Sequence, residues 1–141
     1  MITNISITTV FVKDVDESKR FYTDVLGFEE KDDVVMGDYR WCTVVHPNQP
    51  ELMVHLNIPG PPFSPEMVEA INRSLDGGGM NGLGLSVDDC HATVADLKAK
   101  GVHFVHPPQP VNRGDRLELW SATFRDPDDH NIAITQLRAI R

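Results

Sequence analysis

The hydrophobic and polar positions of this chain form a pattern that occurs twice. In the first half, β-branched residues dominate residues 2–12, which predicts a strand. A helix is expected next, because Asp14 is an N-cap residue with Glu17 three positions later, and Gly27 can adopt the left-handed conformation that ends helices. Further strands are predicted over residues 28–36, 39–46 and 52–58.

The second half repeats this order of elements. Leu83 and Leu85 alternate with small residues, which predicts a strand. Asp89 and Gly101 occupy the positions of Asp14 and Gly27, so a second helix is expected between them. Strands are then predicted over residues 102–106, 116–125 and 131–137.

A proline- and glycine-rich segment separates the halves. Ser64 and Pro65 start a short amphipathic helix, which the glycine run at 77–79 ends. This run lacks the sequence pattern of a phosphate-binding loop, so we interpret it as part of a connector.

These elements predict the α+β fold class, with paired βαβββ modules forming an eight-stranded, cleft-enclosing sheet. We expect one domain over residues 1–141. Module one covers about 1–58, the inserted helix about 59–79 and module two about 80–141. Facing modules bury each other's apolar surface and leave a cleft, where a binding site is expected.

Composition excludes several classes of protein. The 141 residues carry a net charge of −8, which argues against binding to nucleic acid and to anionic membranes. No apolar run approaches the roughly 20 residues of a membrane-spanning helix, and no signal peptide is recognisable. Cys42 and Cys90 form no CxxC motif, which favours buried free thiols and a cytoplasmic location.

Three segments carry a family resemblance: residues 11–28, which contain Phe21-Tyr22 and Leu26-Gly27-Phe28, residues 87–102, and residues 124–131. In this order they resemble the vicinal oxygen chelate superfamily, which includes glyoxalase I, extradiol dioxygenases, fosfomycin-resistance enzymes and bleomycin-binding proteins. The resemblance implies the paired-module fold and a homodimer. It does not settle the function, because one fold hosts many chemistries.

Active members of that superfamily usually bind a divalent metal through inward-facing His, Glu or Gln side chains. The resemblance places these ligand positions at Ile7, Gly82 and Ala133. None of these residues has the imidazole, carboxylate or thiolate donor that a metal requires. We therefore expect no metal site of the family's kind and no cofactor.

The residues proposed to bind a ligand are Trp41, His55 and Trp120. By analogy, the alternation around His55 directs it into the cleft, where it is a ligand contact, an acid/base group, a metal ligand or a structural histidine. Trp41 and Trp120 are separated by nearly the repeat offset, so both are predicted at equivalent third-strand positions. They either form two walls of a ligand site or belong to the core.

Other polar residues give weaker signals. His106 is expected on an edge strand, His130 beside a turn, and Arg113 and Arg116 in a loop that either contacts an anion or is solvated. The sequence also offers no pair of carboxylates that we can place together.

Two functions from different classes follow. The first is a glyoxalase/bleomycin-resistance-like protein that lacks the metal site and binds a small organic molecule in the inter-module cleft. The alternative is a metal-dependent lyase, isomerase or dioxygenase of the glyoxalase type. The missing metal ligands favour the first, and the identity of the ligand is left open.

Overall fold

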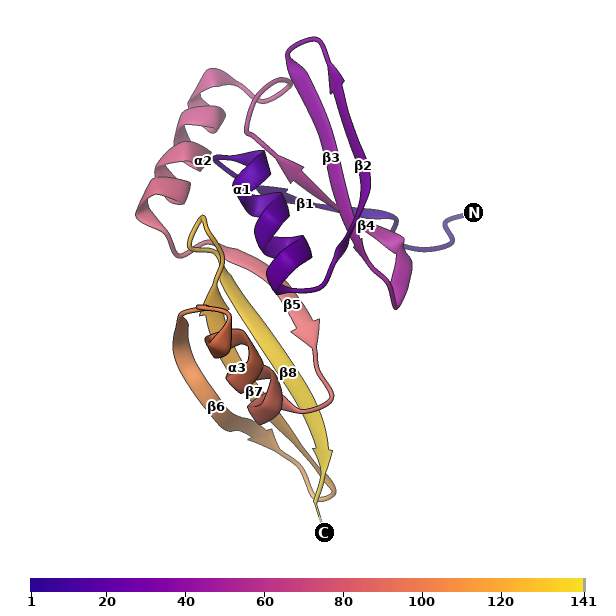
Figure 1. Cartoon of the computed structure of the whole chain (residues 1–141), viewed down its shortest axis with the longest axis vertical. Coiled ribbons are helices and arrows are strands. Elements are labelled where there is room, and N and C mark those ends of the chain that lie inside the picture. Colours follow the sequence, from indigo (N-terminus) through magenta and orange to yellow (C-terminus); the bar gives the residue numbers. More distant parts are fainter. Residues whose placement is uncertain (141) are drawn as a thin grey trace. The chain divides into compact units, whose positions relative to one another are not determined.

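The computed structural model describes residues 1–140 (Figure 1). The chain divides into two compact units, Met1–Gly78 and Gly79–Arg141, which we call the first and second modules. Each module contains one four-stranded sheet.

The first module follows the predicted order of elements. These are β1 (Ile7–Phe11), α1 (Val15–Arg20) continued by a π-helical turn (Phe21–Val25), β2 (Glu29–Met36), β3 (Tyr39–His46), β4 (Gln49–Asn57) and α2 (Pro65–Gly77). The sheet has the order β1-β4-β3-β2, and β1 pairs with β4 in parallel while the other neighbours are antiparallel. The Asp14 carboxylate accepts the backbone N–H of Glu17 at 3.1 Å, so the predicted cap starts α1.

Alternation along the strands builds the core of this module. Val44 and Val54 are opposite each other on β3 and β4, and both are buried. They face the same side of the sheet as Val10 and Leu56, where the hydrophobic residues of α1 and its π-helical turn complete the core. The residues between them on β3 and β4 therefore face the other side, which is where the candidate site lies.

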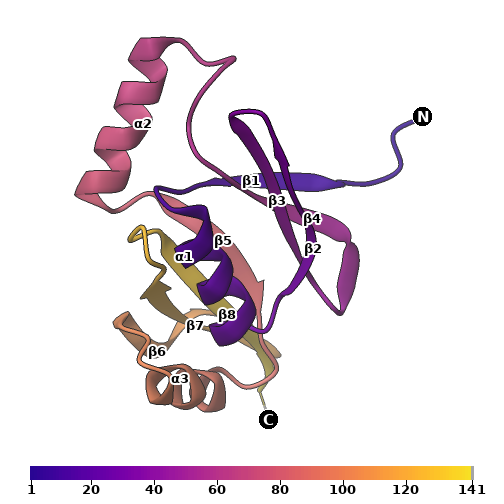
Figure 2. The same ribbon diagram turned by 45° about the horizontal axis from the view of Figure 1, so that its top comes forward.

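The second module repeats the order of elements of the first, without a helix that corresponds to α2. Its elements are β5 (Asn81–Ser86), α3 (Cys90–Ala99), β6 (Phe104–Arg113), β7 (Leu117–Arg125) and β8 (Asn131–Ala139), in the sheet order β5-β8-β7-β6. The Asp89 carboxylate caps α3 through the backbone N–H of Ala92 at 3.0 Å. Figure 2 shows α3 lying across this sheet, where it packs on β6, β7 and β8. Phe124, Ile132 and Ile134 form the buried layer beneath α3.

The predicted α+β fold of two βαβββ modules is confirmed, and its eight strands are divided into two four-stranded sheets. Some boundaries differ from the prediction. The first strand begins at Ile7, and β6 continues to Arg113 through a stretch that was expected to be a loop. β6 is an edge strand whose pairing with β7 is irregular, and an edge tolerates its prolines, which have no N–H to donate.

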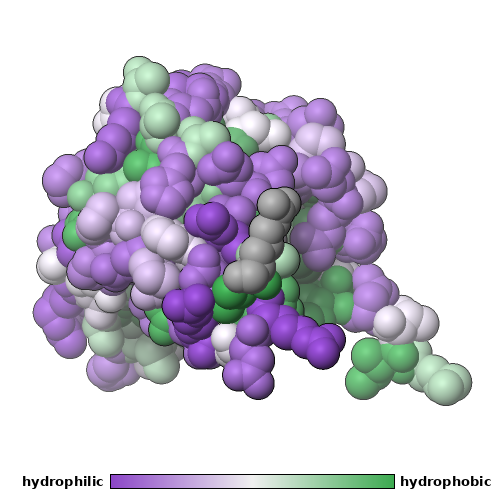
Figure 3. Space-filling model, turned by 90° about the horizontal axis from the view of Figure 1, so that it is seen from below, coloured by the Kyte–Doolittle hydropathy of each residue, from purple (hydrophilic) through white to green (hydrophobic). Residues whose placement is uncertain are grey.

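Hydrophilic residues cover most of the face shown in Figure 3, in keeping with the net charge of −8. Within residues 1–140, no helix combines the length and apolar character required to cross a membrane.

Candidate functional site

The candidate site lies on the face of the first module's sheet that α1 does not cover. Thr43 on β3 is directly opposite His55 on β4, and Trp41 is two residues along β3 on the same face. His55 is only 6% exposed, so neighbouring side chains cover it almost completely.

Two aromatic residues cover His55. The Tyr39 hydroxyl is 3.1 Å from Nε2 of His55, within hydrogen-bonding distance. The Trp41 ring lies over the imidazole, with a distance of 4.4 Å between ring centroids and an angle of 37° between the planes. Tyr39 was not among the predicted site residues, although its two-residue spacing from Trp41 places both side chains on one face of β3.

A carboxylate completes this group, which we call the His55 cluster (Asp32, Tyr39, Trp41, Thr43 and His55). The Asp32 carboxylate accepts hydrogen bonds from the Trp41 indole at 3.4 Å and from the Thr43 hydroxyl at 3.3 Å. The backbone N–H of Asp32 donates to the same hydroxyl at 3.2 Å. These bonds hold the Trp41 ring in place from the side of β2, so the cluster spans three strands.

Burial lowers the pKa of His55, because a buried imidazolium loses its hydration. The imidazole is therefore neutral at pH 7 and has one donor and one acceptor nitrogen. A neutral histidine, a phenol and an indole together offer hydrogen-bonding groups and aromatic faces, the combination found in sites for small organic molecules.

Trp120 lies in a different environment from Trp41. It shares one face of β7 with Ala122 and Phe124, which are buried beneath α3, and its ring is 5.0 Å from that of His91 on α3. Trp41, in contrast, lies on the sheet face opposite the helix. Both tryptophans lie on the third strand of their module, as predicted, but Trp41 faces away from the helix of its module and Trp120 shares the helix-covered face of β7. Side chains alternate along a strand, so a one-residue offset reverses the face.

The polar atoms around Trp120 also differ from those around Trp41. Its indole donates to the Glu118 carboxylate at 2.8 Å, and the Arg138 guanidinium lies 5.2 Å from its ring. These are contacts within the second module alone. Contact of Trp120 with a ligand stays a prediction.

The residues that the resemblance places at the family's metal-ligand positions, Ile7, Gly82 and Ala133, offer no side-chain donor to a metal. Ile7 lies on the His55 face of the first sheet, and Ala133 lies opposite Thr123 in the second; both have hydrocarbon side chains. A Cβ atom at Gly82 would be 3.0 Å from Cβ of His130 and 3.2 Å from Cγ1 of Ile132. A Cβ atom at position 82 would therefore press on the buried side chains of His130 and Ile132.

A buried acidic group that was not among the predicted site residues occupies the turn between β7 and β8. Ligand atoms of Asp126, Asp128 and His130 lie within 4.8 Å of one another, so the group could bind a metal. Asp126 Oδ1 accepts the backbone N–H groups of Asp128 at 3.0 Å and His130 at 2.9 Å. Its Oδ2 lies 2.8 Å from Nδ1 of His130. Asp126, Asp128 and His130 occupy every second position after Phe124, and this spacing is the sequence signal that could have located the group.

Burial and the neighbouring negative charges shift the pKa of His130 in opposite directions. Burial lowers the pKa of His130, but the hydrogen bond to Asp126 and the negative charges of the neighbouring aspartates raise it more, so the net shift is upward. His130 and Asp126 thus form a buried hydrogen-bonded pair, and an Nδ1–H group that donates to the Asp126 carboxylate cannot bind a cation. These bonds indicate a structural role in closing the turn.

The two buried histidines are expected to titrate in opposite directions from the ordinary histidine pKa of about 6.5. NMR titration of the imidazole resonances should give His55 a midpoint below that value and His130 one above it. The stabilisation from the His130 pair should be fully present below about pH 6.5 and disappear as the pH rises through the raised pKa. A His55 midpoint above that of His130 would contradict both environments.

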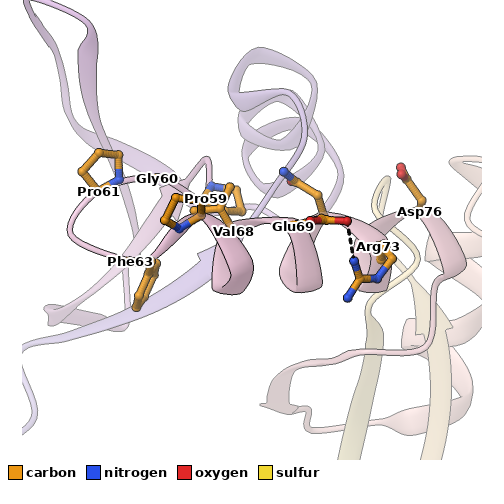
Figure 4. Close-up of a pocket in the computed structure, with 10 residues that line it drawn as sticks. Pro59, Gly60, Pro61, Phe63, Val68, Glu69, Arg73 and Asp76 are labelled. Carbon is orange, nitrogen blue, oxygen red and sulfur yellow. Dashed lines mark hydrogen bonds and ion pairs between the residues drawn. The ribbon is translucent and has the colours of Figure 1, made fainter.

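A separate hollow runs along α2 in the first module. It encloses about 700 Å³ and is lined by Pro59, Phe63, Val68 and Arg73, among others. Figure 4 shows Phe63 and the prolines at one end and the Glu69–Arg73 ion pair, 2.8 Å long, further along the helix. None of the predicted site residues lines this hollow.

The chain is similar to known proteins along nearly its full length. The family model for the glyoxalase/bleomycin resistance protein/dioxygenase superfamily matches residues 4–134. An uncharacterised Bacillus subtilis protein, YurT, is 31% identical over 135 residues, which cover 94% of this chain and 98% of YurT.

Two solved structures share the fold. UcmS2 is 32% identical with a TM-score of 0.81, covering 96% of this chain and 98% of its own. TnmS3, an antibiotic-binding protein from Streptomyces sp. CB03234, is 25% identical with a TM-score of 0.71, covering 97% and 98%. With a family match that spans both modules, the chain belongs to the glyoxalase/bleomycin resistance protein/dioxygenase superfamily.

Proposed function

We propose that this protein binds a small, partly apolar organic molecule, without a metal, at the His55 cluster of the first module. The observation that carries the proposal is the contact of His55 with both Tyr39 and Trp41 on the sheet face that α1 leaves uncovered. Aromatic side chains supply apolar contact area with little loss of conformational freedom, and the hydroxyl and imidazole groups orient a polar substituent.

The cluster is prepared for binding before any ligand arrives. Asp32 restrains the Trp41 ring, and Tyr39 occupies one nitrogen of His55. Side chains that are already ordered lose less entropy when a ligand binds, so more of the contact energy contributes to affinity. The similarity to TnmS3, which is an antibiotic-binding protein, supports a binding function of this type.

The metal-dependent enzyme has less support. Ile7, Gly82 and Ala133 offer no donor at the family's ligand positions, and the buried Asp126–His130 pair uses its polar atoms within the turn. The cleft expected between the modules, the ligand contact of Trp120, the homodimer and the cytoplasmic location stay predictions.

Removal of the His55 side chain should weaken ligand binding. For a planar aromatic compound selected by a thermal-shift screen, we expect His55→Ala to cost about 1 kcal/mol or more in binding free energy, measured by titration calorimetry. Tyr39→Phe, which removes only the hydroxyl, should cost part of this. His103→Ala, at an exposed histidine of the second module, is the matched control and should bind normally. Unchanged affinity in a folded His55→Ala protein would place the site elsewhere.

A further inference from the structure

The second module contains a polar pocket that the proposed function does not use. It encloses about 430 Å³ and is lined by residues from all four strands of the sheet: Asn81, Val105, His106, Thr123, Arg125, Asn131 and Ala133. Side chains of Asp and Glu are missing from this lining, although the chain as a whole carries a net charge of −8.

Strand register brings these side chains to one face. Thr123 is directly opposite Ala133 on β7 and β8, and Arg125 is directly opposite Asn131. Asn131 also pairs with Asn81 on β5. The intervening Phe124 is buried beneath α3, so the pocket lies on the face of the sheet that α3 leaves uncovered.

Arg125 is the only cationic side chain of fixed charge in this lining, and one neighbour orients it. Its Nε donates to Oδ1 of Asn131 at 3.3 Å. Within residues 1–140, its guanidinium forms no ion pair with a carboxylate, and its two terminal nitrogen atoms form no hydrogen bond. A guanidinium that is half-buried, oriented and without a counter-ion favours a planar oxyanion, which it can bind with two parallel hydrogen bonds.

The remaining lining completes a site for a small organic acid. The Thr123 hydroxyl and the amide groups of Asn81 and Asn131 can donate further hydrogen bonds, while Val105 and Ala133 provide apolar contacts. Ala133 adds no charge to this lining, so no carboxylate at that position competes for Arg125. From this arrangement we infer that the pocket binds the carboxylate group of a small organic anion, with Arg125 as its principal contact.

The test uses the full-length protein with benzoate as the probe. Amide chemical shifts of Thr123 and Asn131 should change on titration with benzoate and stay unchanged with benzamide, its neutral counterpart. Arg125→Gln should weaken benzoate binding at least 10-fold, whereas Arg113→Gln, which removes one charge from an exposed position of the same module, should leave it unchanged.

The outcomes separate this inference from its alternatives. Equal responses to benzoate and benzamide, or normal benzoate binding by Arg125→Gln, would overturn it. An equal response to inorganic phosphate would also overturn the carboxylate assignment and indicate a general oxyanion pocket. The benzoate–benzamide comparison uses the unmodified protein, so it holds even if Arg125→Gln fails to fold. His55→Ala should leave benzoate binding intact, which keeps this result distinct from a failure of the proposed function.

Discussion

Replacement of Asp126 with alanine is expected to lower the free energy of unfolding by about 3–5 kcal/mol, the usual cost of removing one partner of a buried ion pair. The change leaves Nδ1 of His130 without its carboxylate partner at a position that is 2% exposed. It also leaves the backbone N–H groups of Asp128 and His130 without their acceptor. Urea denaturation followed by circular dichroism measures the loss.

The matched control is Asp129→Gly in the same turn. Asp129 is exposed, and its φ of 58° lies in the left-handed region that glycine adopts without strain. This variant should change the stability by less than about 1 kcal/mol. If Asp126→Ala lowered the free energy of unfolding no more than the control does, the Asp126–His130 pair would not hold the turn together. The Asp126, Asp128 and His130 group would then have to be reconsidered as a cation site.

Placing a histidine at position 82 (Gly82→His), where the resemblance puts a metal ligand of the family, is expected to destabilise the protein by about 1–3 kcal/mol without creating a metal site. Even a Cβ atom would be 3.0 Å from Cβ of His130, so buried neighbours must shift to accept the side chain. Gly84→Ala is the matched control on the same strand, because no atom lies within 4 Å of its added Cβ.

Elemental analysis gives the second readout for this variant. Both the natural protein and Gly82→His are expected to lack a stoichiometric divalent metal after mild chelation, since Ile7 and Ala133 still offer no donor. A Gly82→His protein of normal stability that retains about one metal per chain would show that position 82 faces an open site.

The sequence predicted the modular plan because local signals and alternation act over short distances. Asp14 and Asp89 cap their helices as expected. Val54 and Leu56 are buried on one face of β4, which placed His55 on the other.

The pairing between strands determines which side chains come together in each candidate site. Tyr39 reaches His55 only because the β3–β4 register brings their strands together. Alternation along the strands also puts Trp41 and Trp120 in different environments. A sequence offset close to the repeat does not specify which face of its sheet a residue occupies.

By itself, the sequence determined two βαβββ modules, their helix caps and the chemical character of each strand face, because these depend on residues close together along the chain. Only the tertiary structure decided which side chains share a site. It buried the Asp126–His130 pair within a turn, and it placed Gly82 close to the buried His130 side chain and Arg125 beside Asn131 in a pocket without carboxylates. The physical reason is that burial and pairing across a sheet depend on register between strands, which short-range patterns do not encode.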